Sequence, residues 1–232
     1  MSVLKPFNVP CPLCGEAVAF SVAQSVNAGR RPDLRAEIIA GSFQRETCPH
    51  CASLFRLDPR LTYIDDTRGH WILAAPLRDQ PEWAAMEAQA QEAFALGYGP
   101  AAPAFAQAIG ATLTPRLVFG WAALAEKLIA AEAGLDDITL ELLKLSIIRS
   151  GNADLLSDDT ELRLIAADDG SITLGQIKAA GEKLIERITL PRAAYQSIAD
   201  ARTAWADLRA ALSAGPFVDL NRLLVLPSAA AA

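Results

Sequence analysis

The sequence has no long hydrophobic run and no pattern typical of a signal peptide. Its apolar stretches fall short of the roughly 18 to 20 consecutive residues that a membrane-spanning helix requires. The opening residues, MSVLKPFNVPCPLC, contain no long apolar segment ahead of a small-residue cleavage site. We therefore expect a cytoplasmic protein with no membrane as a partner.

Positive charge is also scarce. The 232 residues include 21 Lys and Arg against 27 Asp and Glu, for a formal net charge of −6. Residues 1–80 carry nine basic against eight acidic residues, and the remainder carries 12 against 19. Proteins that bind nucleic acids usually present a basic face, so this composition does not favour a nucleic-acid partner. With 52% hydrophobic and 21% charged residues, the composition favours a packed core.

The chain lacks the common catalytic signatures. It contains no GxSxG nucleophile motif, no phosphate-binding glycine loop, no dinucleotide fingerprint and no HExxH motif. Histidine occurs only twice, at His50 and His70. These absences favour a non-catalytic protein and leave open an enzyme that carries no common motif.

Cysteine is rare, but all of it lies in two matching Cys-Pro-x-Cys pairs. Cys11 pairs with Cys14, and Cys48 pairs with Cys51. Each pair can bring two thiolates to one side of an ion, and two pairs complete the tetrahedral shell that zinc prefers. A shell of four thiolates has no open position for a substrate. We therefore predict that these four residues bind a structural Zn²⁺.

Other uses of the four cysteines stay open at this point. They could be buried apolar residues, disulfides of an exported protein or ligands of an iron–sulfur cluster. The second pair, with Pro49 and His50 inside it, also matches the active-site tetrapeptide of thioredoxin-like oxidoreductases, where a helix N-terminus activates the first cysteine. Residues 53–57 are typical of a strand rather than a helix, so zinc is favoured over redox chemistry.

The two histidines each have a functional and a structural interpretation. His50 could replace a cysteine as a ligand, but four sulfurs already complete a shell. His70 together with Asp65 and Asp66 could form an acid–base site, although residues 65–69 are also typical of a turn. We expect the structural interpretation for both.

A second group of acids precedes and enters an expected helix. Asp136 and Asp137, with Glu141 and Lys144, could form a carboxylate cluster for another metal. Acids at the start of a helix are equally well explained by capping and by the helix dipole. We expect capping here.

The hydrophobic pattern predicts an α+β protein that changes character near residue 80. Residues 1–80 are predicted to form a zinc-ribbon-like, β-rich module with a short helix, and residues 81–232 a mostly α-helical region with one β-hairpin. Helices are expected at 32–40, 79–97, 117–133, 136–148, 177–188 (with Gly181 on its apolar face) and 191–212. Strands are expected at 17–26, 54–57, 62–64 and 71–74, the hairpin at 161–174, a loop at 97–103 and a frayed end at 228–232.

The motifs resemble a known family. The doubled Cys-Pro-x-Cys motif, residues 25–27 and residues 63–65 together are similar to the CpXC domain family of bacteria and archaea, over about residues 7–130. The resemblance implies that the four cysteines are metal ligands, and it implies no reaction. One position departs from many zinc knuckles, because Ala52 follows the second pair where glycine is common.

Three functions follow as hypotheses. The first is a zinc-stabilised interaction or scaffold module that binds another protein or itself. The second is an enzyme whose site lies where the two parts meet, near His70. The third is a nucleic-acid-associated zinc ribbon, which would need the N-terminal arginines on one face. These arginines are Arg30, Arg31, Arg35, Arg45, Arg56, Arg60 and Arg68.

Overall fold

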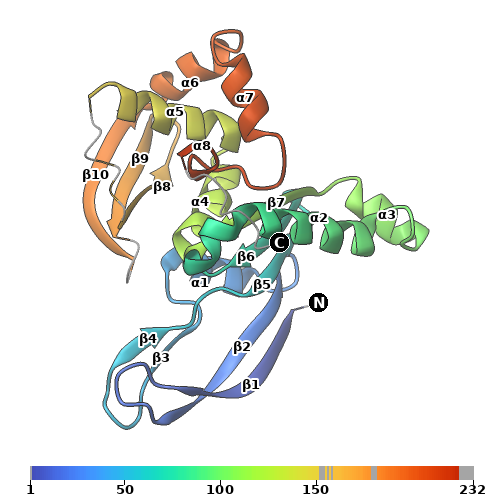
Figure 1. The fold of residues 1–232 in the computed structure, drawn as a ribbon, viewed down its shortest axis with the longest axis vertical. Coiled ribbons are helices and arrows are strands. Elements are labelled where there is room, and N and C mark those ends of the chain that lie inside the picture. Colours follow the sequence, from blue (N-terminus) through green and yellow to red (C-terminus); the bar gives the residue numbers. More distant parts are fainter. Residues whose placement is uncertain (1, 152–154, 156, 158, 179–181, 225–232) are drawn as a thin grey trace.

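The computed structural model describes residues 2–151, 155, 157, 159–178 and 182–224. The fold is mixed α/β, and the described residues form a five-stranded sheet, a three-stranded sheet and a two-stranded hairpin. Figure 1 shows the N-terminal strands extending away from the rest of the molecule, and helices α2 (Trp83–Tyr98) and α3 (Ala104–Gly110) extending in another direction. The β-rich N-terminal part expected from the sequence is therefore present.

The five-stranded sheet has the order β1-β2-β5-β6-β7. β2 pairs in parallel with β5, and β6 in parallel with β7, while the other neighbours are antiparallel. Three of its strands, β2, β5 and β6, were expected from the sequence, β2 from its β-branched and aromatic residues, whereas the first and the last were not. The five strands are β1 (Val3–Pro10), β2 (Ala17–Asn27), β5 (Leu61–Asp65), β6 (His70–Ala75) and β7 (Thr114–Phe119).

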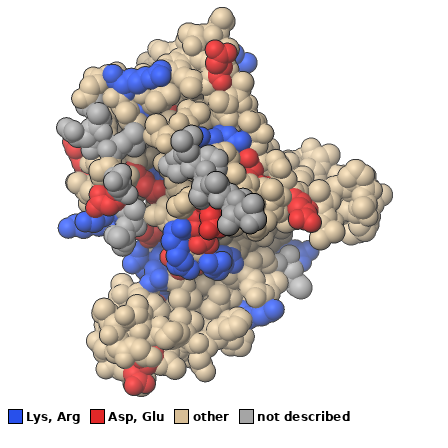
Figure 2. Space-filling view, viewed as in Figure 1, with Lys and Arg blue, Asp and Glu red and all other residues tan. Residues whose placement is uncertain are grey.

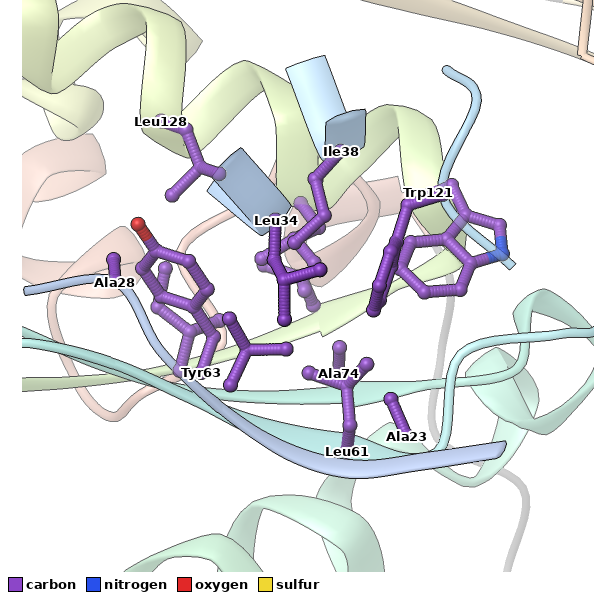
Figure 3. Close-up of a cluster of buried hydrophobic side chains, with 14 of the residues drawn as sticks. Ala23, Ala28, Leu34, Ile38, Leu61, Tyr63, Ala74, Trp121 and Leu128 are labelled. Carbon is purple, nitrogen blue, oxygen red and sulfur yellow. The ribbon is translucent and has the colours of Figure 1, made fainter. Parts of the chain in front are cut away.

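Helices cover both faces of this sheet because its central strands are apolar on both sides. Ile72 and Ala74 of β6 face the cluster that contains α1 (Pro32–Ala40) and α4 (Gly120–Glu132). Trp71 and Ala75 alternate with them and pack toward α2 on the opposite face. Figure 3 shows the cluster between the sheet and helices α1 and α4, with Trp121 of α4 at one end.

A second core joins α4 to the C-terminal half. Helices α5 (Asp137–Arg149) and α6 (Arg192–Asp200) pack on the three-stranded antiparallel sheet, whose order is β10-β9-β8. The hairpin expected at 161–174 is confirmed as β8 (Thr160–Ala167) and β9 (Ser171–Lys178). The C-terminal part therefore contains a sheet and not a lone hairpin.

The helix predicted at 177–188 is wrong. Its first residues end β9, and Leu184 and Ile188 lie in β10 (Lys183–Pro191). Apolar residues four apart share one face of a helix and also one face of a strand, so this spacing could not distinguish the two. Gly181, which the prediction placed on the same helix, lies outside the described residues, as do residues 228–232.

The helix predicted at 117–133 begins too early. Leu117, Val118 and Phe119 belong to the buried strand β7, and α4 starts at Gly120, whose φ is +81°. A short apolar run fits a buried strand as well as a helix. The helix predicted at 191–212 is likewise two helices, α6 and α7 (Ala206–Leu212), and a short α8 (Asn221–Leu224) follows.

The N-terminal sheet continues past residue 80, because β7 is its last strand. α3 also occupies part of the chain after the loop expected at 97–103. The division into 1–80 and 81–232 stays a prediction. Among the described residues, no helix has both the length and the apolar character of a membrane span.

Candidate metal centre

The two cysteine pairs lie at the tips of two neighbouring hairpins. Cys11 and Cys14 occupy the turn between β1 and β2, and Cys48 and Cys51 the turn between β3 (Arg45–Thr47) and β4 (Leu54–Arg56) (Figure 1). In both turns the first cysteine donates its N–H to the carbonyl oxygen five residues on, at 2.8 Å. Its own carbonyl oxygen accepts the N–H four residues on, at 2.9 Å. Two distant stretches of sequence thus form the same knuckle.

The four sulfur atoms form one compact group. All Sγ atoms lie within 4.8 Å of one another, and the Cys11–Cys51 and Cys14–Cys48 pairs are each 3.7 Å apart. Thiolates bound to Zn²⁺ at about 2.3 Å in a tetrahedron lie about 3.8 Å apart, so the group has nearly the size of such a shell. All four cysteines are free of disulfides. They could therefore hold a metal ion.

Ser53 supports the sulfur group from beside it. Its Oγ lies 3.0 Å from Sγ of Cys51 and 3.4 Å from Sγ of Cys11. The Ser53 hydroxyl lowers the pKa of Cys11 to about 6, with backbone N–H groups of the first knuckle adding to the effect, and it also lowers the pKa of Cys51. Metal ions bind thiolates, so Ser53 favours the form of both side chains that a metal requires.

A family comparison agrees with this geometry. The sequence model described as CpXC protein matches residues 9–144, which is more than half of the chain and includes both knuckles. The chain belongs to the CpXC family. No curated protein and no solved structure matches it. The resemblance drawn from the cysteine motifs is confirmed, and the CpXC match runs through α4 into α5.

Sequence reasoning missed Ser53 in this CpXC protein. Its signal was positional: Ser53 stands five residues after Cys48, where the knuckle returns to the next strand and its carbonyl oxygen accepts the Cys48 N–H. A hydroxyl at that position can reach the sulfurs. Only the distance between the two hairpins, which the sequence does not show, places it beside Cys11 as well.

Replacing Ser53 with alanine is expected to weaken Zn²⁺ binding about tenfold, because losing a hydrogen bond to a metal ligand typically lowers metal affinity by at least this factor. The fold should persist, since the bond from Cys48 N–H goes to the Ser53 backbone. Competition with a chromophoric chelator measures the affinity. Ser42→Ala is the matched control, because that hydroxyl contacts the backbone oxygen of Glu37. Equal affinities for Ser53→Ala and wild type would contradict the assignment.

The two CpXC knuckles share a positive φ after the second cysteine but differ in the residue that adopts it. Gly15 and Ala52 occupy equivalent places after the second cysteine, with φ of +77° and +58°. Glycine adopts positive φ without strain, whereas a Cβ makes it unfavourable. The departure noted in the sequence therefore places a strained alanine in the second knuckle.

Ala52→Gly is expected to stabilise the metal-loaded protein by about 1 kcal/mol, because it relieves that strain. Gly15→Ala should destabilise it by a similar amount, since the space around the new Cβ is open and only the backbone conformation is penalised. Urea unfolding of both variants, with zinc present, measures the two changes. Changes of the same sign would show that φ at these positions is not the cause.

The other residues that the sequence singled out do not join this group. His50 is exposed in the second knuckle. Asp136 caps α5 by accepting the Thr139 N–H at 2.9 Å, which confirms the capping interpretation. Asp137 pairs instead with Arg116. Within the described ranges, the four cysteines are the only cluster of at least three His, Cys, Asp or Glu side chains spaced for a metal.

The alternative acid–base group of His70, Asp65 and Asp66 is only partly brought together. Asp65 is buried at the end of β5, opposite His70 in β6, and it accepts hydrogen bonds from Tyr63 Oη and Arg68. Asp66 is an exposed turn residue. The turn interpretation is therefore confirmed for residues 65–69.

His70 nevertheless lines a polar pocket of about 350 Å³ between β6 and α4. Arg116, Lys127 and Asp137 line the same pocket, and Asp137 lies 2.7 Å from Arg116 and 3.0 Å from Lys127. Burial would raise the pKa of Asp137, but the two cations outweigh it and hold that pKa well below its usual range. Burial lowers the pKa of His70, whose Nδ1 has no hydrogen-bond partner within the described structure.

Proposed function

We propose that this CpXC protein is a non-catalytic, cytoplasmic protein-interaction module stabilised by one structural Zn²⁺. The observation that supports it most directly is the group of four sulfurs within 4.8 Å. Thiolate ligands in a tetrahedral group favour zinc, and four of them leave no position for a reacting water. The metal would then maintain a binding surface and take no part in chemistry.

Exposed apolar side chains near the knuckles support the interaction role. Leu13 and Leu54 are 77% and 61% exposed beside the cysteines, and Phe7 is 48% exposed on β1. Leu96 and Phe105, on the projecting helices α2 and α3, are 80% and 72% exposed. Leu13 and Leu54, on the two neighbouring hairpins, are therefore the residues we expect a partner protein to contact.

The metal content of the purified protein tests the proposal. We expect one zinc per chain by elemental mass spectrometry, and none after Cys11→Ser or Cys51→Ser. A stoichiometric iron content with visible thiolate-to-iron absorption would replace zinc with an iron–sulfur site. The interaction role is tested with Leu13→Glu plus Leu54→Glu, which should lose partners that wild type retains while keeping its zinc.

Two of the alternatives from the sequence lose support. Six of the seven N-terminal arginines contact acids, although Arg45 and Arg56 share one glutamate, so these arginines do not supply the row of free cations that phosphate binding requires. For redox chemistry, Cys48 is buried, and the short strand β4 follows the second knuckle where a helix would be required.

An enzyme remains the second candidate because of the pocket at His70. A lowered pKa keeps His70 neutral near pH 7, and a neutral imidazole can act as a general base. A panel of small polar metabolites tested by thermal shift addresses this candidate. A compound that stabilises wild type but not His70→Asn would support it, and no such compound in a broad panel would speak for the non-catalytic module.

A further inference from the structure

Two arginines face each other across the short hairpin that carries the second knuckle. Arg45 of β3 and Arg56 of β4 are directly paired in the register of that hairpin. Like charges in opposite positions destabilise a strand pair. Both side chains contact Glu182, the residue just before β10, so two positive charges meet one carboxylate.

The charges at this place do not balance. Glu182 Oε2 lies 2.5 Å from Arg56 Nη1 but 3.5 Å from Arg45 Nη2. Arg45 is held instead by its Nε, which donates to the Gly41 carbonyl oxygen at 2.5 Å, so its contact with Glu182 is the weaker of the two. The Arg56 side chain is 9% exposed, and its Nη2 has no hydrogen-bond partner within the described part of the chain. Burial lowers the pKa of Arg56, Glu182 opposes this, and Arg45 adds to it. Arg45, whose side chain is 34% exposed, therefore keeps a positive charge that Glu182 meets only weakly. Two other acids, Asp58 and Glu161, line a cavity together with Glu182 and are paired with Arg78 and Arg163.

The three charged side chains stand at the junction of two adjoining cavities of about 490 and 300 Å³. Trp121 lines both, and its ring lies 4.4 Å from Arg56 Cζ. The larger cavity continues over α1 and α4, and the smaller over β4 and the start of α4. Figure 2 shows Lys and Arg side chains gathered where the N-terminal extension meets the body of the molecule. Apolar residues along the two cavities include Ile38, Ile39, Ile129 and Ile165 in the first, and Leu54, Phe55, Pro59 and Leu77 in the second.

We propose that this cleft binds an extended peptide segment of a partner protein, with one Asp or Glu side chain between apolar residues. The carboxylate would lie against Arg45 and Arg56, and the flanking apolar side chains would enter the two cavities. The inference rests on the protein-interaction role proposed above and names the chemistry of the partner. Sites of this size that combine apolar walls with a few convergent polar groups are typical binding sites.

The shape of the cleft favours a peptide over a small carboxylate. Apolar space lies on both sides of the arginines, so a ligand with a carboxylate at one end would fill one cavity and leave the other empty. A chain that crosses the charged centre fills both. Glu182 then acts as an internal competitor, because its carboxylate occupies part of the position that the partner's carboxylate would take.

Selection from a displayed library of short random peptides tests the proposal. Wild type is expected to enrich peptides with an acidic residue between apolar ones. For a selected peptide, changing Glu to Gln should weaken binding at least about tenfold, the worth of a charge-assisted hydrogen bond. Arg45→Gln should weaken it similarly, and Arg45→Lys less so. Arg60→Gln, which changes an exposed arginine paired with Asp79 elsewhere, should have no effect.

Glu182→Gln provides a test of opposite sign. It should raise the affinity for the acidic peptide severalfold, because the competitor is gone, whereas a purely structural role of Glu182 would lower it. Circular dichroism and zinc content confirm that each variant is folded. The proposal is overturned if no peptides are enriched, or if the enriched peptides lack an acidic residue. It is also overturned if octanoate competes as strongly as the peptide, or if the protein forms a dimer that Arg45→Gln dissociates. If the wild-type protein still holds one zinc in that case, the proposal of a zinc-stabilised module stands although the peptide site is wrong.

Discussion

Removing the metal is expected to unfold the tips of the two cysteine hairpins while the five-stranded sheet stays folded. The buried residues around the knuckles are Cys11, Val18 and Cys48, with Phe55 packed beside them. Such a small apolar cluster cannot offset the loss of conformational entropy. Structural zinc in comparable small sites contributes about 10–16 kcal/mol, so a zinc bound here would decide whether the knuckles stay folded.

Hydrogen exchange followed by mass spectrometry measures this effect directly. With EDTA, or after Cys48→Ser, exchange should become fast in peptides covering residues 11–18 and 48–55. These include the amides of Cys11, Gly15, Cys48 and Ala52, which form the knuckle hydrogen bonds. Amides of β5 and β6 should stay protected, because they lie between helices in a separate core. EDTA should add nothing to the Cys48→Ser variant. Unchanged exchange at the knuckles after verified metal loss would show that the site does not hold the hairpins together.

The two knuckles could be predicted from the sequence because each one is formed by neighbouring residues. A Cys-Pro-x-Cys turn needs only neighbouring residues, so both turns and the residues they supply could be read from spacing. The helix at 32–40, with Pro32 in its first turn and Gly41 after its end, was also local and is confirmed as α1. Strand β10 was missed because the spacing of its apolar residues fits a helix equally well.

The cleft around Arg45 and Arg56 could not be predicted from the sequence, because it depends on strand register and on distant chain segments. Arg45 and Arg56 are 11 residues apart and become partners only through the pairing of β3 with β4. Glu182, which contacts both, comes from the turn that leads into β10. Each of these residues looks ordinary in the sequence, because exposed arginines and glutamates are common on any surface. The cleft therefore becomes visible only in the folded chain.

A buried charge network in the second core could not be predicted from the sequence either, because its residues come from distant segments. Lys144 lies 2.7 Å from Glu126 and 2.8 Å from Glu141, and Arg163 lies 3.2 Å from Glu126 and 2.5 Å from Asp219. The sequence suggested Glu141 and Lys144 as part of a metal cluster or a cap, whereas they join α5 to α4. The network thus connects two helices, β8 and the segment before α8.

Titration behaviour shows how far these charges depend on one another. Burial would raise the pKa of Glu126, but Lys144 and Arg163 outweigh it and lower that pKa. For Glu141, burial prevails and raises the pKa to about 7. Burial alone would lower the pKa of Lys144, but the two glutamates raise it. Lys144 is therefore charged, and it compensates Glu126 and the ionised fraction of Glu141, both of which are buried.

Lys144→Met is expected to destabilise the protein by about 3–5 kcal/mol, the usual cost of leaving a buried charge without its partner. Methionine keeps the length of the side chain, so the loss comes from charge and not from volume. Urea unfolding, followed by the fluorescence of the four tryptophans, measures it. Adding Glu141→Gln should recover part of the loss, because it removes one uncompensated carboxylate. Lys178→Met, which breaks an exposed pair with Asp159, should cost no more than about 1 kcal/mol. A Lys144→Met protein as stable as this control would refute the network's role.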